Sequence, residues 1–196
     1  MVGSQKSNGQ MPEYKVRSRF FAPPPEFDGC FTSFYHLDLT VEDGATIIDH
    51  LQPEWAGLRF VSGSRPIARL GNTTVDHPRF AASGPSSLPT HFEIGSTRLW
   101  GVGLMPLGWC RLMDADAKSL ANIACNAEHH LAFAKFAPLA DVLCDPEVDD
   151  QVQFDAICDT MRGLMQTTRD DEKVMRVHRA MVDENLGSVS EFAKES

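Results

Sequence analysis

The sequence predicts an α+β protein in which a β-sandwich or β-barrel precedes a group of helices. From Tyr14 to about Met105, short runs of β-branched and aromatic residues alternate with Gly, Pro and Asn at intervals of roughly ten residues, which is typical of all-β domains. After Met105 the apolar residues recur every three or four positions, the period of amphipathic helices. The 196 residues, 42% of them hydrophobic, suffice for one domain with a sizeable core.

Residues 1–12 are polar, and we expect a disordered lead because they cannot bury enough apolar surface to offset the entropy of ordering. Residues 13–106 hold the predicted strands, with turn signals such as Glu42-Asp43-Gly44 and Gly71-Asn72 between them. The strands are expected at 14–21, 30–41, 45–51, 57–63, 66–71, 73–77, 79–83, 90–95 and 97–105.

The strand expected at 30–41 alternates strictly, so its side chains divide into two faces. Aromatic residues occur on both faces, and the pattern therefore leaves open which face points inward. One face carries Cys30, Thr32, Phe34, His36 and Asp38, and the other carries Phe31, Ser33, Tyr35, Leu37 and Leu39.

Residues 107–185 are predicted to be helical. A short helix opens at Pro106, and residues 119–126 and 128–144 are expected as short helices or irregular connections. The clearest helix follows, with Asp145 as its predicted N-cap and Pro146 at its first position. A second amphipathic helix is expected at about 170–184. The stripe of the clearest helix is Phe154, Ile157, Cys158, Met161, Leu164 and Met165.

Charge and cysteine usage narrow the class of protein. A net charge of -9 and a pI near 5.2 argue against nucleic-acid or anionic-membrane binding by this part of the chain. The five cysteines form no CxxC pair, which indicates reduced thiols in a cytoplasmic protein. The opening "MVGSQKSNGQMP" has no apolar run, and no stretch approaches the length of a membrane span, so we expect neither a signal peptide nor a membrane segment.

No catalytic constellation is visible. His36, His50, His77 and His91 each stand alone on a predicted strand, with no HxH pair to begin a metal site. There is no GxSxG, and the GxG at Gly101 lacks the strand-to-helix setting of a dinucleotide loop. The sequence therefore predicts no enzyme activity, no metal and no cofactor.

Aromatic residues on successive strands predict a small-molecule pocket, because such sites are mainly apolar and aromatic with a few polar groups. The same aromatic residues would also serve simply to fill a barrel. The candidate pocket residues are Phe34, His36, Asp49, Trp55, Arg59, Phe60, His91 and Trp100.

Four segments, in this order, resemble the N-terminal part of AraC-type bacterial transcription regulators. They are "FFAPPPEFDGCFTSFYHLDL", "IIDHLQPEWAGLRFVSG", "FAASGPSSLPTHFEIGSTRLWGVGLMPLGW" and "HRAMVDENLGSVSEFAKES". The resemblance spans about residues 19–196. It implies a cupin-like β-barrel of the double-stranded β-helix type over 13–106, followed by a helical linker and dimerisation region over 107–185.

The resemblance also implies an unknown small-molecule effector, a homodimer, and DNA binding only through a C-terminal domain missing from this chain. Residues 186–196 would then begin a truncated helix-turn-helix domain, with Ser188 and Glu191 as a capping box. The candidate dimer contacts are Phe154, Ile157, Met161, Leu164 and Met165, although this stripe could equally pack on its own barrel. The alternatives are a cupin-type metal-dependent enzyme and a stand-alone small-molecule or protein binding module.

Overall fold

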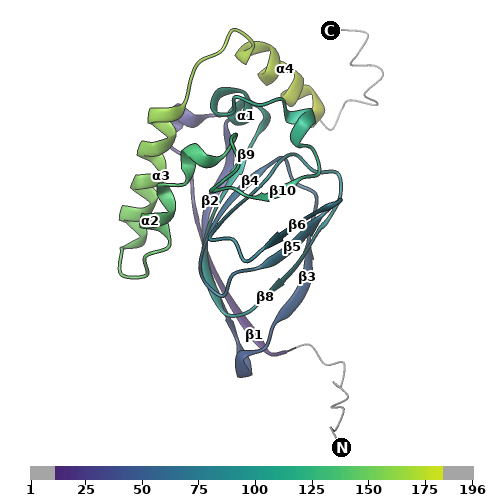
Figure 1. The fold of residues 1–196 in the computed structure, drawn as a ribbon. Helices are drawn as coiled ribbons and strands as arrows, with labels where there is room; N and C mark the ends of the chain where they lie inside the picture. The colour runs from purple at the N-terminus through teal and green to yellow at the C-terminus, as the bar shows by residue number, and fades with distance from the viewer. Residues whose placement is uncertain (1–11, 183–196) are drawn as a thin grey trace, which may run out of the picture.

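A computed structural model describes residues 12–182 and contains two antiparallel β-sheets that face each other, with helices against the outer side of the larger one (Figure 1). The six-stranded sheet has the order β1-β2-β9-β4-β7-β10, and the four-stranded sheet has the order β3-β8-β5-β6. The α+β class predicted from the sequence is confirmed. Within the described residues, however, the strands form two separate hydrogen-bonded sheets and not the closed cupin-like barrel that was expected.

The nine predicted strands all form, and each boundary agrees to within two residues. Residues 124–126 form a tenth strand that was not predicted, because it pairs with a strand about forty positions earlier in the chain. The larger sheet contains β1 (Tyr14–Phe21), β2 (Phe31–Val41), β9 (Thr97–Leu104), β4 (Gly57–Gly63), β7 (Phe80–Ser83) and β10 (Ala124–Asn126). The smaller sheet contains β3 (Ile47–Leu51), β8 (Thr90–Ile94), β5 (Ile67–Leu70) and β6 (Thr73–Asp76).

Four α-helices are present in the described range: α1 (Pro106–Leu112), α2 (Leu139–Leu143), α3 (Asp150–Leu164) and α4 (Asp171–Val182). Short 3₁₀ turns lie at Pro25–Phe27, Glu42–Gly44, Ala117–Leu120 and Ala134–Phe136. No helix between residues 12 and 182 has the length and apolar character needed to cross a bilayer.

The predicted start of α3 at Asp145 is wrong. The N-cap is Asp149, whose side chain accepts a hydrogen bond from the backbone N–H of Gln151 at 2.7 Å. Asp145 instead accepts from the N–H of Glu147 at 3.0 Å, and its own carbonyl accepts from the Gln153 side chain at 2.9 Å. These two bonds hold a separate turn before the helix.

The main core lies between the larger sheet and the helices. Phe34, Phe60, Phe80 and Trp100 are fully buried there, and Phe60 stacks on Phe80 with ring centroids 4.3 Å apart. Phe31 joins this core despite its place on the opposite face of the alternation, because the register of β2 against β9 shifts between Phe31 and Phe34. The core therefore combines residues of the strands with residues of α1, α2 and α3.

Both chain ends lie outside the described residues. The predicted disordered lead falls almost entirely within residues 1–11, and the predicted helix-turn-helix start at 186–196, with Ser188 and Glu191, falls within 183–196.

Candidate ligand cavity between the sheets

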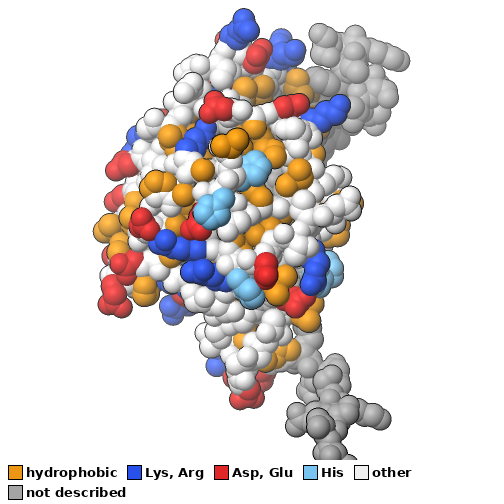
Figure 2. Space-filling view, in the orientation of Figure 1, with side chains coloured by type: hydrophobic (Ala, Val, Ile, Leu, Met, Phe, Trp, Pro, Cys, Tyr) orange, Lys and Arg blue, Asp and Glu red, His pale blue; other side chains and the backbone are white. Residues whose placement is uncertain are grey.

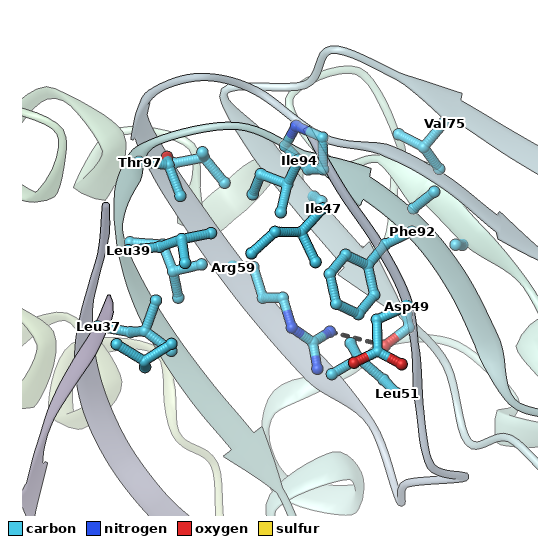
Figure 3. Close-up of a pocket in the computed structure, with 18 of the residues that line it drawn as sticks. Leu37, Leu39, Ile47, Asp49, Leu51, Arg59, Val75, Phe92, Ile94 and Thr97 are labelled. Carbon is cyan, nitrogen blue, oxygen red and sulfur yellow. Dashed lines mark hydrogen bonds between the residues drawn. The ribbon is translucent and has the colours of Figure 1, made fainter. Parts of the chain in front are cut away.

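A cavity of about 350 Å³ lies between the inner faces of the two sheets (Figure 3). Its walls are mostly aliphatic, and both sheets contribute to them. The larger sheet supplies Leu37, Leu39, Val61 and Leu99, and the smaller sheet supplies Ile47, Leu51, Ala68, Phe92 and Ile94.

Small residues on the larger sheet leave room for this cavity. Gly101 is the register partner of both Tyr35 and Arg59, so these three residues form one row across β2, β9 and β4. A Cβ added at Gly101 would overlap the Tyr35 ring, and one added at Gly57 would lie 3.0 Å from Arg59 Nη1. The two long side chains therefore lie flat over glycines, and the space above them stays open.

Arg59 lies at one end of the cavity and forms an ion pair with Glu54, which is not itself a wall residue. Nη2 of Arg59 donates to both carboxylate oxygens of Glu54 at 2.7 Å, and the Ser83 hydroxyl donates to Glu54 Oε1 at 3.0 Å. Nη1 of Arg59 makes only a long contact of 3.5 Å with Ser83 Oγ. Figure 3 shows the guanidinium and Asp49 at the same end, with Ile47, Ile94 and Leu39 farther away.

The guanidinium stays charged in this setting. Burial acts to lower the pKa of Arg59, but the nearby Tyr35 hydroxyl and Glu54 carboxylate more than offset it, so the pKa is raised above its usual value. The cavity thus combines an apolar body with the charged guanidinium of Arg59.

Of the eight candidate pocket residues, the structure places only Asp49 and Arg59 in the cavity wall. The expectation fails for the four residues Phe34, His36, Phe60 and Trp100, which lie on the opposite face of the larger sheet and are buried against the helices. Neighbouring residues of a strand point to opposite faces of the sheet. A candidate chosen one position away from a wall residue therefore lies in the core and not in the cavity wall.

The remaining two candidates also lie outside the cavity wall. Trp55 belongs to the β3–β4 connection and meets His178 of α4 edge-on, with ring centroids 5.5 Å apart. His91 lies on the outer face of β8, where its ring is 5.0 Å from that of His50. The structure puts Phe92, the next residue, in the wall instead.

Several wall residues were not among the predicted candidates. Tyr35, Leu37 and Leu39 belong to one of the two faces that the alternation of this strand separates. The alternation therefore groups these residues together, but it does not show that their face lines the cavity. No local pattern marks Ser83, which lies in the wall, or Glu54, which is not a wall residue but pairs with Arg59.

A different polar cluster ties α3 to the helix side of the larger sheet. Gln153 is fully buried; its Oε1 accepts from Trp100 Nε1 at 2.6 Å and from Arg98 Nη2 at 3.1 Å. Its Nε2 donates to the carbonyls of Val142 and Asp145, both at 2.9 Å. Every hydrogen-bonding atom of this amide is therefore used.

His36 belongs to the same cluster. Its Nε2 accepts a hydrogen bond from Arg98 Nε at 2.7 Å, which requires that nitrogen to be unprotonated. Burial lowers the pKa of His36; Asp150 opposes this effect and Arg98 adds to it, and the net shift is downward. This histidine and Trp100 thus belong to the seam between the sheet and α3.

The candidate dimer stripe packs against its own chain. Ile157 and Met161 are fully buried, and Phe154 is half-buried and stacks on Phe21 with centroids 5.0 Å apart. Leu164 and Met165 are half-buried against the same core. The stripe therefore packs within its own subunit, which was one of the two arrangements expected from the sequence, the other being a dimer contact.

Within residues 12–182, no three His, Cys, Asp or Glu side chains come close enough together to bind a metal ion. All five cysteines are free, and burial raises the pKa of Cys125 and of Cys158 to about 11, so these two thiols are protonated at neutral pH.

The sequence matches no protein-family model and none of the curated proteins. Among solved structures, the chain is similar to the crystal structure of the AraC-like transcriptional activator CuxR, with a TM-score of 0.38 and 12% sequence identity. The alignment covers 92% of this chain and 75% of that chain.

Proposed function

We propose that this chain is the effector-sensing part of an AraC-like transcription regulator, and that it binds a small molecule between its two sheets without converting it. The cavity carries this proposal. Protein interiors normally pack without large voids, whereas this chain keeps about 350 Å³ open between its sheets. That volume is within the usual range of small-molecule sites, and the apolar wall with few polar groups is the usual chemistry of such sites.

Surface charge supports a sensing role in which DNA is contacted by another part of the protein. The net charge of -9 opposes phosphate binding. On the face shown in Figure 2, Lys and Arg side chains are interspersed with Asp and Glu and do not gather into one basic patch. The order of segments that resembles AraC-type regulators is consistent with a DNA-reading domain outside this chain.

The connection between β3 and β4 offers a route from the cavity to the helices. Glu54 pairs with Arg59, which lines the cavity, and the next residue, Trp55, contacts His178 of α4. An effector that shifts Glu54 would thereby act on the docking of α4. Such an effector changes the population of two arrangements only if it binds them with different affinity.

Binding is tested with N-phenyl-1-naphthylamine, an apolar dye that fluoresces when it leaves water. The wild-type chain is expected to bind the dye, and Ala68→Phe, which projects into the cavity from β5, is expected to abolish binding. Ile67→Phe is the matched control, because this neighbour is not part of the cavity wall. Equal dye binding by wild type and Ala68→Phe, with near-UV circular dichroism showing both folded, would contradict the proposal.

The proposed homodimer needs contacts other than the buried stripe of α3. Exposed apolar residues that remain available on the helices include Val152 on α3 and Met181 on α4, which are 55% and 58% exposed. Light scattering is expected to give twice the chain mass of 21.7 kDa, and the double variant Val152→Asp/Met181→Asp is expected to halve it. A wild-type mass of one chain would reject the homodimer.

A further inference from the structure

We propose that the cavity selects an uncharged apolar molecule bearing one hydrogen-bond acceptor, such as a ketone or alcohol oxygen, and that Glu54 is the residue that excludes carboxylates. This inference rests on the proposed function and specifies the chemical class of its effector.

The Arg59 guanidinium at the polar end of the cavity keeps spare hydrogen-bonding capacity, although the Tyr35 hydroxyl also bonds to it. Nη2 of Arg59 is occupied by both oxygens of Glu54 at 2.7 Å, and the Ser83 hydroxyl is directed to Glu54 as well. Nη1 has only the 3.5 Å contact with Ser83, beyond the usual length of an N–H···O bond. A ligand oxygen near Nη1 would accept a hydrogen bond for which the chain itself offers only this long contact.

Charge at this end disfavours an anion. Arg59 and Asp49 provide one positive and one negative charge at this end of the wall, and Glu54, which is not a wall residue, adds a second negative charge through its pair with Arg59. A ligand carboxylate would bring a third negative charge into a partly buried region, where like charges repel more strongly than in water. A ketone or alcohol oxygen accepts the same hydrogen bond without that cost.

The rest of the cavity fits an apolar body. Beyond Arg59 and Asp49 the wall is formed by side chains such as Leu39, Ile47 and Ile94. A single polar group at one end and an aliphatic remainder therefore match the two parts of the site. A polyhydroxylated molecule would leave most of its hydroxyl groups without partners.

Three probes with the same chain length test the selectivity by displacing N-phenyl-1-naphthylamine at neutral pH: 2-octanone, 1-octanol and octanoate. The ketone and the alcohol are expected to displace the dye at concentrations about tenfold lower than octanoate, equivalent to about 1.4 kcal/mol. Glu54→Gln keeps a hydrogen-bonding side chain but removes the charge, and is expected to lower the concentration of octanoate required by about tenfold. The required concentration of 2-octanone should hardly change.

Glu42→Gln is the control, since this exposed glutamate is neither part of the cavity wall nor bonded to Arg59, whereas Glu54 is bonded to it. Octanoate equal to or better than 2-octanone in the wild type would overturn the selectivity, because it would show that a carboxylate replaces Glu54 on Arg59. An unchanged ratio in a folded Glu54→Gln variant would overturn the role of Glu54. If that variant does not fold, the wild-type ranking alone decides the proposal.

These outcomes differ from a failure of the proposed function. A reversed ranking accompanied by dye binding that Ala68→Phe abolishes would leave the sensing site intact and reject only the uncharged class. Failure of the dye and all three probes to bind the wild-type chain would reject both.

Discussion

The two faces of the six-stranded sheet differ although the same strands build them. On the helix side, Phe34, Phe60 and Trp100 are fully buried and their space is filled. One position along the same strands, Tyr35, Arg59 and Gly101 face a cavity. On the helix side, large aromatic rings fill the space and form the core. On the other side, Tyr35 and Arg59 lie flat over glycines, so the space between the two sheets stays open as a cavity.

Polar groups follow the same division. Gln153 on the helix side uses every donor and acceptor of its amide within the chain. Arg59 on the cavity side leaves Nη1 with a single long contact. A saturated cluster fixes the structure, whereas an incomplete one offers a partner to a ligand.

Truncation on the filled face should have the largest effect. Phe60→Ala removes a ring that stacks on Phe80 and is expected to lower the free energy of unfolding by about 3 to 5 kcal/mol. Leu99→Ala on the cavity face should cost only about 1 to 2 kcal/mol, since Leu99 already borders open space. Urea unfolding measures both, and equal losses would remove the distinction between the faces.

Disruption of the saturated cluster should rank next. Gln153→Met leaves Trp100, Arg98 and two backbone carbonyls without their partner, with an expected loss of about 2 to 4 kcal/mol in the free energy of unfolding. Gln151→Met, on the exposed side of the same helix, should change it by less than about 0.5 kcal/mol. A similar small change for both variants in urea unfolding would show that the cluster does not anchor α3.

Changes at two glycines should have opposite signs. Gly101→Ala places a Cβ against the Tyr35 ring and is expected to cost about 1 to 3 kcal/mol while pushing that ring into the cavity and weakening dye binding. Gly163→Ala, in α3 with no atom within 4 Å of the added Cβ, should stabilise the chain by about 0.5 to 1 kcal/mol. Thermal unfolding with dye titration tests both, and unaltered dye binding by Gly101→Ala would contradict the described cavity floor.

The smallest expected effect is a pH dependence. The pKa of His36 is lower in the folded chain than its usual 6.5, so the unfolded chain binds more protons as pH falls from about 6.5 toward the folded value. The contribution of His36 to stability is therefore complete above about pH 6.5 and declines as the pH falls through this window. His36→Gln should flatten the plot of unfolding free energy against pH there, and an unchanged slope would show that the histidine is not held neutral.

Element positions could be predicted because their signals are local. β-branched runs between Gly, Pro and Asn located nine strands to within two residues, and the apolar period located α3 and α4. The predicted N-cap Asp145 is wrong, because Asp145 holds a separate turn before the helix and Asp149 caps α3 through the N–H of Gln151. The strand at residues 124–126 was missed because its pairing with β7 is not local.

The candidate site was only partly predictable. Arg59 and Asp49 lie in the cavity wall, but strand alternation cannot say which of two apolar faces is covered by helices and which by a second sheet. The ring of Phe34 and the ring of Tyr35 are equivalent in that pattern. Only the layer packed above each distinguishes them.

The sequence by itself determined the α+β class, the strand and helix positions, the acidic charge and the lack of recognisable catalytic motifs. The tertiary structure decided that two open sheets face each other, that the stripe of α3 packs on its own chain, and that Glu54 meets Arg59 at the end of an apolar cavity. The physical reason is the distance along the chain over which each effect acts. Turn preferences and side-chain periodicity depend on a few neighbouring residues. A cavity forms only where strands distant in the sequence come together and leave space between their side chains.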